Sequence, residues 1–139
     1  MLSPQETKDL RAFAGTMIPA SAQYRVPGAD DETIFTDIVK SLGRDVEDVR
    51  TALKTLAGIA DLPPERRLET ANAFRAKGGL PLQAIARAVL QCYYRDDRVM
   101  RSLGIEPRSP FPKGHVVEQG DWSLLDPVKK RAPFWRKVS

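Results

Sequence analysis

Apolar residues recur at three- and four-residue spacing through the first 104 residues, and this period constrains the fold more than any other feature. At the start, Ser3 can cap a helix, Pro4 suits its first position, and Glu6 completes a capping box. The apolar stripe that follows comprises Leu10, Phe13, Ala14, Met17 and Ile18. The sequence therefore predicts a first helix that ends at Pro19.

Five further helical runs follow, each begun by a capping residue or a proline. Their predicted starts are Asp30 or Asp31, Asp45, Pro63-Pro64, Pro81 and Asp96. Gly43, Gly78-Gly79 and Gly104 are placed to end the second, fourth and sixth helices. The second predicted helix, from Asp30 or Asp31, should bury Ile34, Phe35, Ile38, Val39 and Leu42. The fifth, from Pro81, should bury Leu82, Ile85, Ala86, Val89, Leu90 and Tyr93. No convincing alternating strand pattern occurs, so we expect an all-α fold: one small domain of about five or six helices over residues 1–104.

Residues 105–139 differ in composition and form a predicted C-terminal arm. They contain five of the eleven prolines and both tryptophans. Proline disfavours regular helix, so we expect a long extended arm with one short helical turn from Asp126-Pro127 through Arg131. Because disordered tails are usually poor in large aromatics, Phe111, Trp122, Phe134 and Trp135 are interpreted as anchors, either on this chain's own helices or on a partner.

Charge and hydropathy narrow the partner classes. Residues 105–139 carry seven Lys and Arg against four Asp and Glu, whereas residues 1–104 carry 15 against 14. Basic and acidic residues alternate in the helical region, which is typical of a solvated surface and does not favour nucleic-acid binding. No run reaches the roughly 20 apolar residues that cross a bilayer, so we expect no direct membrane insertion.

Few residues of the sequence are candidates for catalysis or for binding a metal or cofactor. Cys92, the single cysteine, lies beside an apolar stripe, which favours a small buried side chain over a nucleophile. His115, the single histidine, has no second ligand at metal-binding spacing. Phosphate-binding loops, dinucleotide fingerprints and nucleophile elbows are absent from the sequence. We therefore predict no catalytic, cofactor-binding or metal-binding residues on this chain.

The stretch from Tyr93 to Val99 is the most distinctive. Adjacent tyrosines at a helix end supply rigid, amphipathic area of the kind favoured in interfaces. Alternatively, Tyr93 fills the core while Asp96 or Asp97 caps the next helix, and both interpretations can hold. The predicted partner contacts are Tyr93, Tyr94, Arg95, Asp96, Phe111, Trp122, Leu124, Phe134 and Trp135.

Two short motifs resemble a known family. Residues 16–20 (TMIPA) end the first helix, and a late Tyr-Tyr-x-Asp-x-x-Val precedes Leu-Gly, ending at Gly104. With the helical middle, these motifs resemble the small third subunit of membrane-associated gluconate 2-dehydrogenase and related flavin-dependent sugar and polyol dehydrogenases. The resemblance spans most of residues 8–104.

This resemblance implies a non-catalytic accessory subunit that supports folding, stability or export of a large FAD-containing subunit, with a cytochrome c subunit as a further partner. FAD is expected on the large subunit and no cofactor on this chain. Family members often carry a twin-arginine signal, which is missing here, so we expect a cytoplasmic protein, or a periplasmic one exported with a signal-bearing partner. The alternatives are a stand-alone helical ligand binder or enzyme, and a basic nucleic-acid-interaction module.

Overall fold

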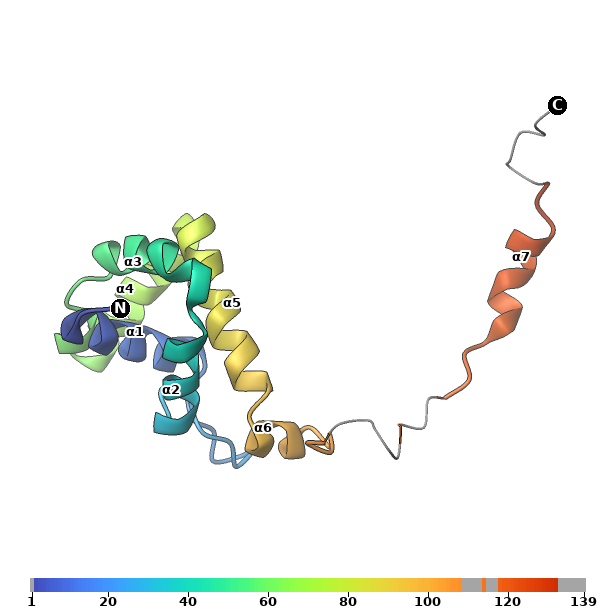
Figure 1. The fold of residues 1–139 in the computed structure, drawn as a ribbon, viewed down its shortest axis with the longest axis horizontal. Helices are drawn as coiled ribbons and strands as arrows, with labels where there is room; N and C mark the ends of the chain where they lie inside the picture. The colour runs from blue at the N-terminus through green and yellow to red at the C-terminus, as the bar shows by residue number, and fades with distance from the viewer. Residues whose placement is uncertain (1, 109–113, 115–117, 133–139) are drawn as a thin grey trace. The chain divides into compact units, whose positions relative to one another are not determined.

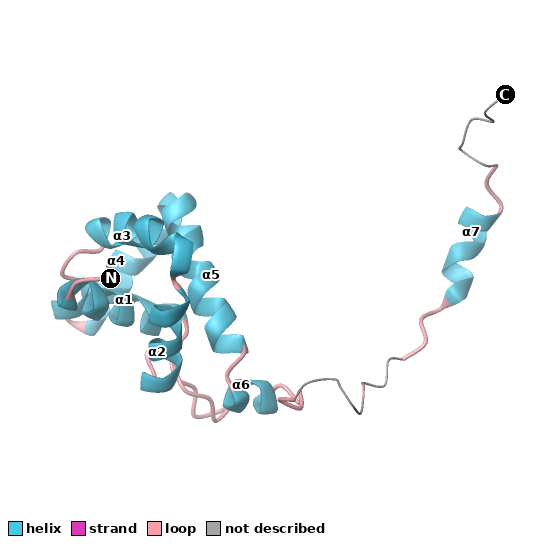
Figure 2. Ribbon diagram, viewed as in Figure 1, coloured by secondary structure: helices cyan, strands magenta, loops and turns pink. Residues whose placement is uncertain are grey.

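The chain forms two units, Met1–Pro107 and Arg108–Ser139, which are described separately. The computed structural model describes residues 2–108, 114 and 118–132. Within these ranges the regular elements are helices, together with one isolated bridge between Ser21 and Val26 (Figures 1 and 2). The first unit contains α1 (Pro4–Met17), α2 (Glu32–Ser41), α3 (Val46–Thr55), α4 (Pro64–Lys77), α5 (Leu80–Tyr94) and α6 (Asp97–Ser102). The predicted all-α fold is confirmed.

The helix starts follow from local capping. At α1 the Ser3 hydroxyl accepts a hydrogen bond from the Glu6 backbone at 3.2 Å, and the Glu6 carboxylate accepts one from the Ser3 backbone at 2.7 Å. Asp31, one of the two predicted candidates, caps α2 by accepting from the backbone N–H groups of Thr33 and Ile34. These contacts satisfy N–H groups that the first helical turn would otherwise leave unpaired.

The hydrophobic core lies within the first unit. Helix α5 packs against α2 and α3, while α1 packs against α3, α4 and the short 3-10 helix η2 (Ile59–Asp61) (Figure 1). At the centre, the rings of Phe13 and Phe74 meet edge to face with centroids 5.5 Å apart. The largest fully buried side chains are Phe13, Leu10, Ile34, Ile38, Leu56, Ile59, Ile85, Val49, Val89 and Val99.

The buried face of α5 differs from the predicted one. Ala84, Ala88 and Cys92 are buried, whereas Ala86 is only partly buried and Leu90 is exposed. Small side chains at four-residue spacing let neighbouring helices approach closely, so the face is set by tertiary packing and not by the largest side chains. In α2, Val39 is likewise exposed at the edge of the predicted buried face.

The described part of the second unit contains two short consecutive helices. They are the 3-10 helix η3 (Trp122–Leu125) and α7 (Asp126–Lys129). The helical turn predicted at Asp126-Pro127 is therefore present, but it ends at Lys129 and not at Arg131 as predicted. The preceding helix η3 was not predicted. Its cap is Asp121, whose carboxylate accepts hydrogen bonds from the backbone and hydroxyl of Ser123 at 3.0 and 2.6 Å.

Candidate interaction site at the end of helix α5

The C-terminal end of α5, helix α6 and the loop of residues 19–30 enclose a small apolar pocket of about 220 Å³. Its lining residues are Tyr24, Val26, Tyr93, Tyr94, Val99, Ser102 and Leu103. Six of these seven side chains are aromatic or branched aliphatic. The pocket therefore presents apolar surface where the loop of residues 19–30 meets the consecutive helices α5 and α6.

The two adjacent tyrosines of α5 have different environments. Tyr93 is only 4% exposed, and its hydroxyl donates a hydrogen bond to the backbone carbonyl of Pro27 at 3.2 Å. Burial raises the pKa of the Tyr93 hydroxyl, which keeps it protonated as a donor. Tyr94 is 54% exposed, and its ring meets that of Tyr93 edge to face at 5.3 Å. Tyr93 thus anchors the loop, and Tyr94 is presented to solvent.

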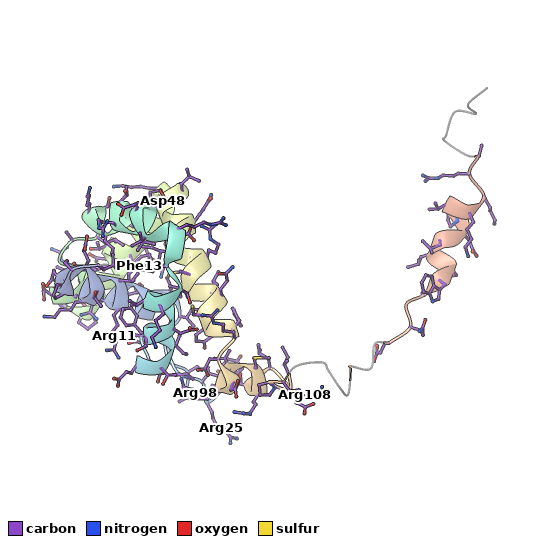
Figure 3. All side chains as sticks on the ribbon, viewed as in Figure 1. Arg11, Phe13, Arg25, Asp48, Arg98 and Arg108 are labelled. Atoms are coloured by element: carbon purple, nitrogen blue, oxygen red, sulfur yellow. The ribbon has the colours of Figure 1, made fainter. Side chains whose placement is uncertain are left out.

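The loop of residues 19–30 is itself fixed by backbone hydrogen bonds. Ser21 and Val26 exchange two of them, at 3.0 and 3.1 Å, and the Ala29 N–H donates to the Ile18 carbonyl at 2.8 Å. Between Ser21 and Val26 the chain turns, and there Tyr24 is 67% exposed while Arg25 points away from the helices (Figure 3). The turn holds Tyr24 at the rim of the pocket.

Arg95 is tied to helix α2. Its guanidinium forms a bidentate pair with Asp37, with both N–O distances 2.6 Å, and also donates to the Ser41 hydroxyl at 2.6 Å. Hydrogen bonding to Arg95 lowers the pKa of the Asp37 carboxyl. In this structure Arg95 therefore has an intramolecular role, and its predicted partner contact stays a prediction.

Asp96 and Arg98 fix the beginning of α6. The Asp96 carboxylate accepts the backbone N–H of Arg98 at 2.9 Å and pairs with the Arg98 guanidinium at 3.0 Å. The same guanidinium reaches Asp31, the cap of α2, at 2.7 Å; Figure 3 labels Arg98. Hydrogen bonds from Arg98 lower the pKa values of Asp31 and Asp96. Arg98 thus joins the starts of two helices and holds α6 beside the pocket.

Exposed apolar side chains continue beyond the pocket. Leu103 and Ile105 are both about half exposed, and the Ile105 N–H donates to the Met100 carbonyl at 2.9 Å, which holds the chain after α6 close to that helix. Together with Tyr24 and Tyr94 they form what we call the Tyr94 surface. Of these, Tyr24, Tyr94 and Leu103 line one pocket, and exposed apolar groups gathered in this way are a feature of interaction sites.

The second unit has an exposed apolar set of its own. Trp122 is 64% exposed, and its indole N–H donates to the Gln119 side chain at 3.1 Å. Leu124 and Val128 are also more than half exposed. Residues 118–122, 124 and 125 line a cavity of about 540 Å³. The other three predicted anchors, Phe111, Phe134 and Trp135, lie outside the described residues.

Cys92 and His115 are the two residues that the sequence analysis weighed as a nucleophile and a metal ligand. Cys92 is buried as predicted, and burial raises the pKa of its thiol. His115 lies outside the described residues. Among the residues that are described, no three His, Cys, Asp or Glu side chains gather into a group that could hold a metal, and no helix has the length and hydropathy of a membrane span.

No family model, curated protein or solved structure matches the chain. The family resemblance therefore stays an expectation drawn from the two short motifs and the helical middle of the sequence. The structure brings segments next to those motifs together: residues 16–20 lead into the loop whose Pro27 accepts the Tyr93 hydrogen bond. Tyr24 and Val26 were not predicted as site residues. The only signal for Tyr24 was an aromatic side chain in a loop rich in Pro, Gly, Ala and Ser, and nothing in the sequence marked Val26.

Proposed function

We propose that the chain is a non-catalytic accessory subunit that binds a larger protein through the Tyr94 surface. The observation that carries this proposal is the rim of exposed apolar side chains, Tyr24, Tyr94, Leu103 and Ile105, on a backbone held by the Tyr93 and Arg98 hydrogen bonds. A preorganised surface loses little conformational entropy on association, so more of its contact energy contributes to affinity.

The identity of the partner is proposed from the motif resemblance. We propose a large flavin-dependent oxidoreductase subunit that holds FAD, with a cytochrome c subunit as a further component. In this arrangement the substrate and the flavin lie on the large subunit, and this chain supports its folding, stability or export. The exposed Trp122 and Leu124 of the second unit add apolar area for the same complex.

The test is affinity capture of the tagged full-length chain from its native host. We expect a yellow flavoprotein at a fixed ratio to the chain, retained through washing in high salt because the contact is mainly apolar. Recovery of the chain alone would contradict the proposal. Recovery of a stoichiometric protein without flavin would support an accessory role but contradict the assignment to a flavin enzyme.

A further inference from the structure

A second cavity in the first unit, of about 240 Å³, is lined largely by cationic side chains. Helix α1 contributes Lys8, Arg11 and Ala12, and the remaining lining residues are Asp30, Ala60 and Arg67. It shares no lining residue with the pocket beside Tyr94. Three cations and one carboxylate therefore surround a single small space.

Both arginines are positioned by neutral backbone carbonyls. The Arg67 guanidinium donates to the carbonyls of Ala60 and Leu62 at 2.8 and 3.1 Å. The Arg11 Nε donates to the carbonyl of Asp30 at 2.8 Å, and its guanidinium lies 5.5 Å from the centre of the Phe35 ring (Figure 3 labels Arg11). These contacts fix the direction of each guanidinium while leaving its charge without a neutralising partner.

Most other arginines of the unit contrast with these two. Arg87, Arg95, Arg98 and Arg101 each pair with an aspartate. Within the described residues, Lys8, Arg11 and Arg67 form no ion pair. In addition, the Arg67 Nε is buried and has no hydrogen-bond partner among the residues that the structure describes. A buried donor without a partner is costly, so the two backbone carbonyls do not use up the hydrogen-bonding capacity of the Arg67 guanidinium.

Asp30 opposes the three cations. A Cβ atom on Gly15 would lie 2.9 Å from the Asp30 Cγ, and one on Gly28 would lie 2.4 Å from its Oδ1, so the absence of side chains at both glycines accommodates this carboxylate. The lining then carries three positive charges and one negative charge. The net positive charge matches a small dianion.

We propose that this cavity binds a tetrahedral oxyanion of the phosphate class. Arginine presents planar, forked donors that suit phosphate oxygens, and lysine adds a third charge. The cavity has room for a phosphate group with a small substituent, so free phosphate and a phosphomonoester are both candidate ligands. This site is independent of the proposed flavoprotein complex.

The experiment titrates the full-length chain with inorganic phosphate at constant ionic strength and follows backbone amide shifts by NMR. We expect saturable shifts confined to residues near Lys8, Arg11 and Arg67. Glycerol phosphate serves as the second probe: tighter binding than free phosphate would identify the phosphomonoester as the preferred source. Acetate should bind at least tenfold more weakly than either probe.

Three variants separate a specific site from general charge attraction. Lys8→Gln, on an exposed side chain with no hydrogen bond of its own in the described residues, should weaken phosphate binding at least fivefold. Asp30→Asn should tighten it severalfold, because it removes the only carboxylate in the lining. Arg66→Gln serves as the control. It removes the arginine next to Arg67 on α4, which lies outside the cavity and pairs with Glu69, and it should leave phosphate binding unchanged.

Shifts that do not saturate would overturn the proposal. So would equal weakening by Lys8→Gln and Arg66→Gln, or an affinity that Asp30→Asn leaves unaltered. The amide spectrum of each variant establishes that it is folded.

Discussion

At the residue scale, Asp9 is the one charged side chain buried in the described part of the chain, with 2% of its surface exposed. Its two carboxylate oxygens accept the backbone N–H groups of Gly58 and Ala60 at 3.1 and 3.0 Å. These two groups belong to the turn after α3 and to η2, so Asp9 attaches that segment to α1. Hydrogen bonds to a buried carboxylate are stronger than those between neutral groups.

We expect Asp9→Ala to lower the free energy of unfolding by about 2–3 kcal/mol, since two buried donors lose a charged acceptor. Asp9→Asn keeps one acceptor oxygen and should cost less. Urea unfolding followed by circular dichroism measures both. Glu69→Ala removes only an exposed ion pair and should stay within about 0.5 kcal/mol of the wild type. A loss from Asp9→Ala no larger than that of Glu69→Ala would contradict the role assigned to Asp9.

At the scale of secondary-structure elements, Arg98 connects the caps of α2 and α6. The pKa values of Asp31 and Asp96 are lowered chiefly by hydrogen bonds from Arg98. Lowered carboxyl pKa values stabilise the fold at pH above about 4, and this contribution is lost as pH falls through the lowered values. Stability linked to this pair of contacts is therefore sensitive to acid.

Arg98→Gln should lower stability at pH 7 by about 1 kcal/mol, because the ion pairs are partly exposed. The difference from wild type should shrink as the pH is reduced from 5 to 2, since the wild type alone loses the Arg98 contribution. Urea unfolding at a series of pH values measures this. Parallel stability curves for the two proteins across that range would contradict the role assigned to Arg98 between the caps of α2 and α6.

The sequence predicted the elements whose determinants are local. Ser3 and Glu6 lie three residues apart, and Pro64 begins α4, so the starts of these helices depend on near neighbours only. The prediction of the buried face of α5 was wrong in part, because that face depends on which helices pack against α5. In the candidate site, Tyr94 could be selected from its own segment. Tyr24 could not, because its position depends on the hydrogen bond between Pro27 and Tyr93, 66 residues apart.

At the scale of the whole molecule, the buried hydrophobic side chains of the described residues all lie between Leu10 and Val99. The described residues of the second unit bury none. Within its own unit Trp122 is therefore an exposed side chain and not part of a hydrophobic core.

Trp122→Ala should accordingly weaken the complex with the partner while leaving the helical circular dichroism signal nearly intact. A buried aromatic anchor costs at least about 2 kcal/mol when truncated in an interface, a loss of roughly 30-fold in affinity. Co-purification with quantified stoichiometry measures the effect. Unchanged recovery of the partner would count against the C-terminal arm as a docking element.

The central claim, that the Tyr94 surface binds the partner, is tested most directly by comparing Tyr94→Ala with Leu90→Ala. Both residues are exposed on α5, but only Tyr94 lines the pocket. Measured against the captured partner, Tyr94→Ala should raise Kd by roughly 30-fold or more, and Leu90→Ala should change it less than threefold. Equal affinities of the two variants would contradict the account.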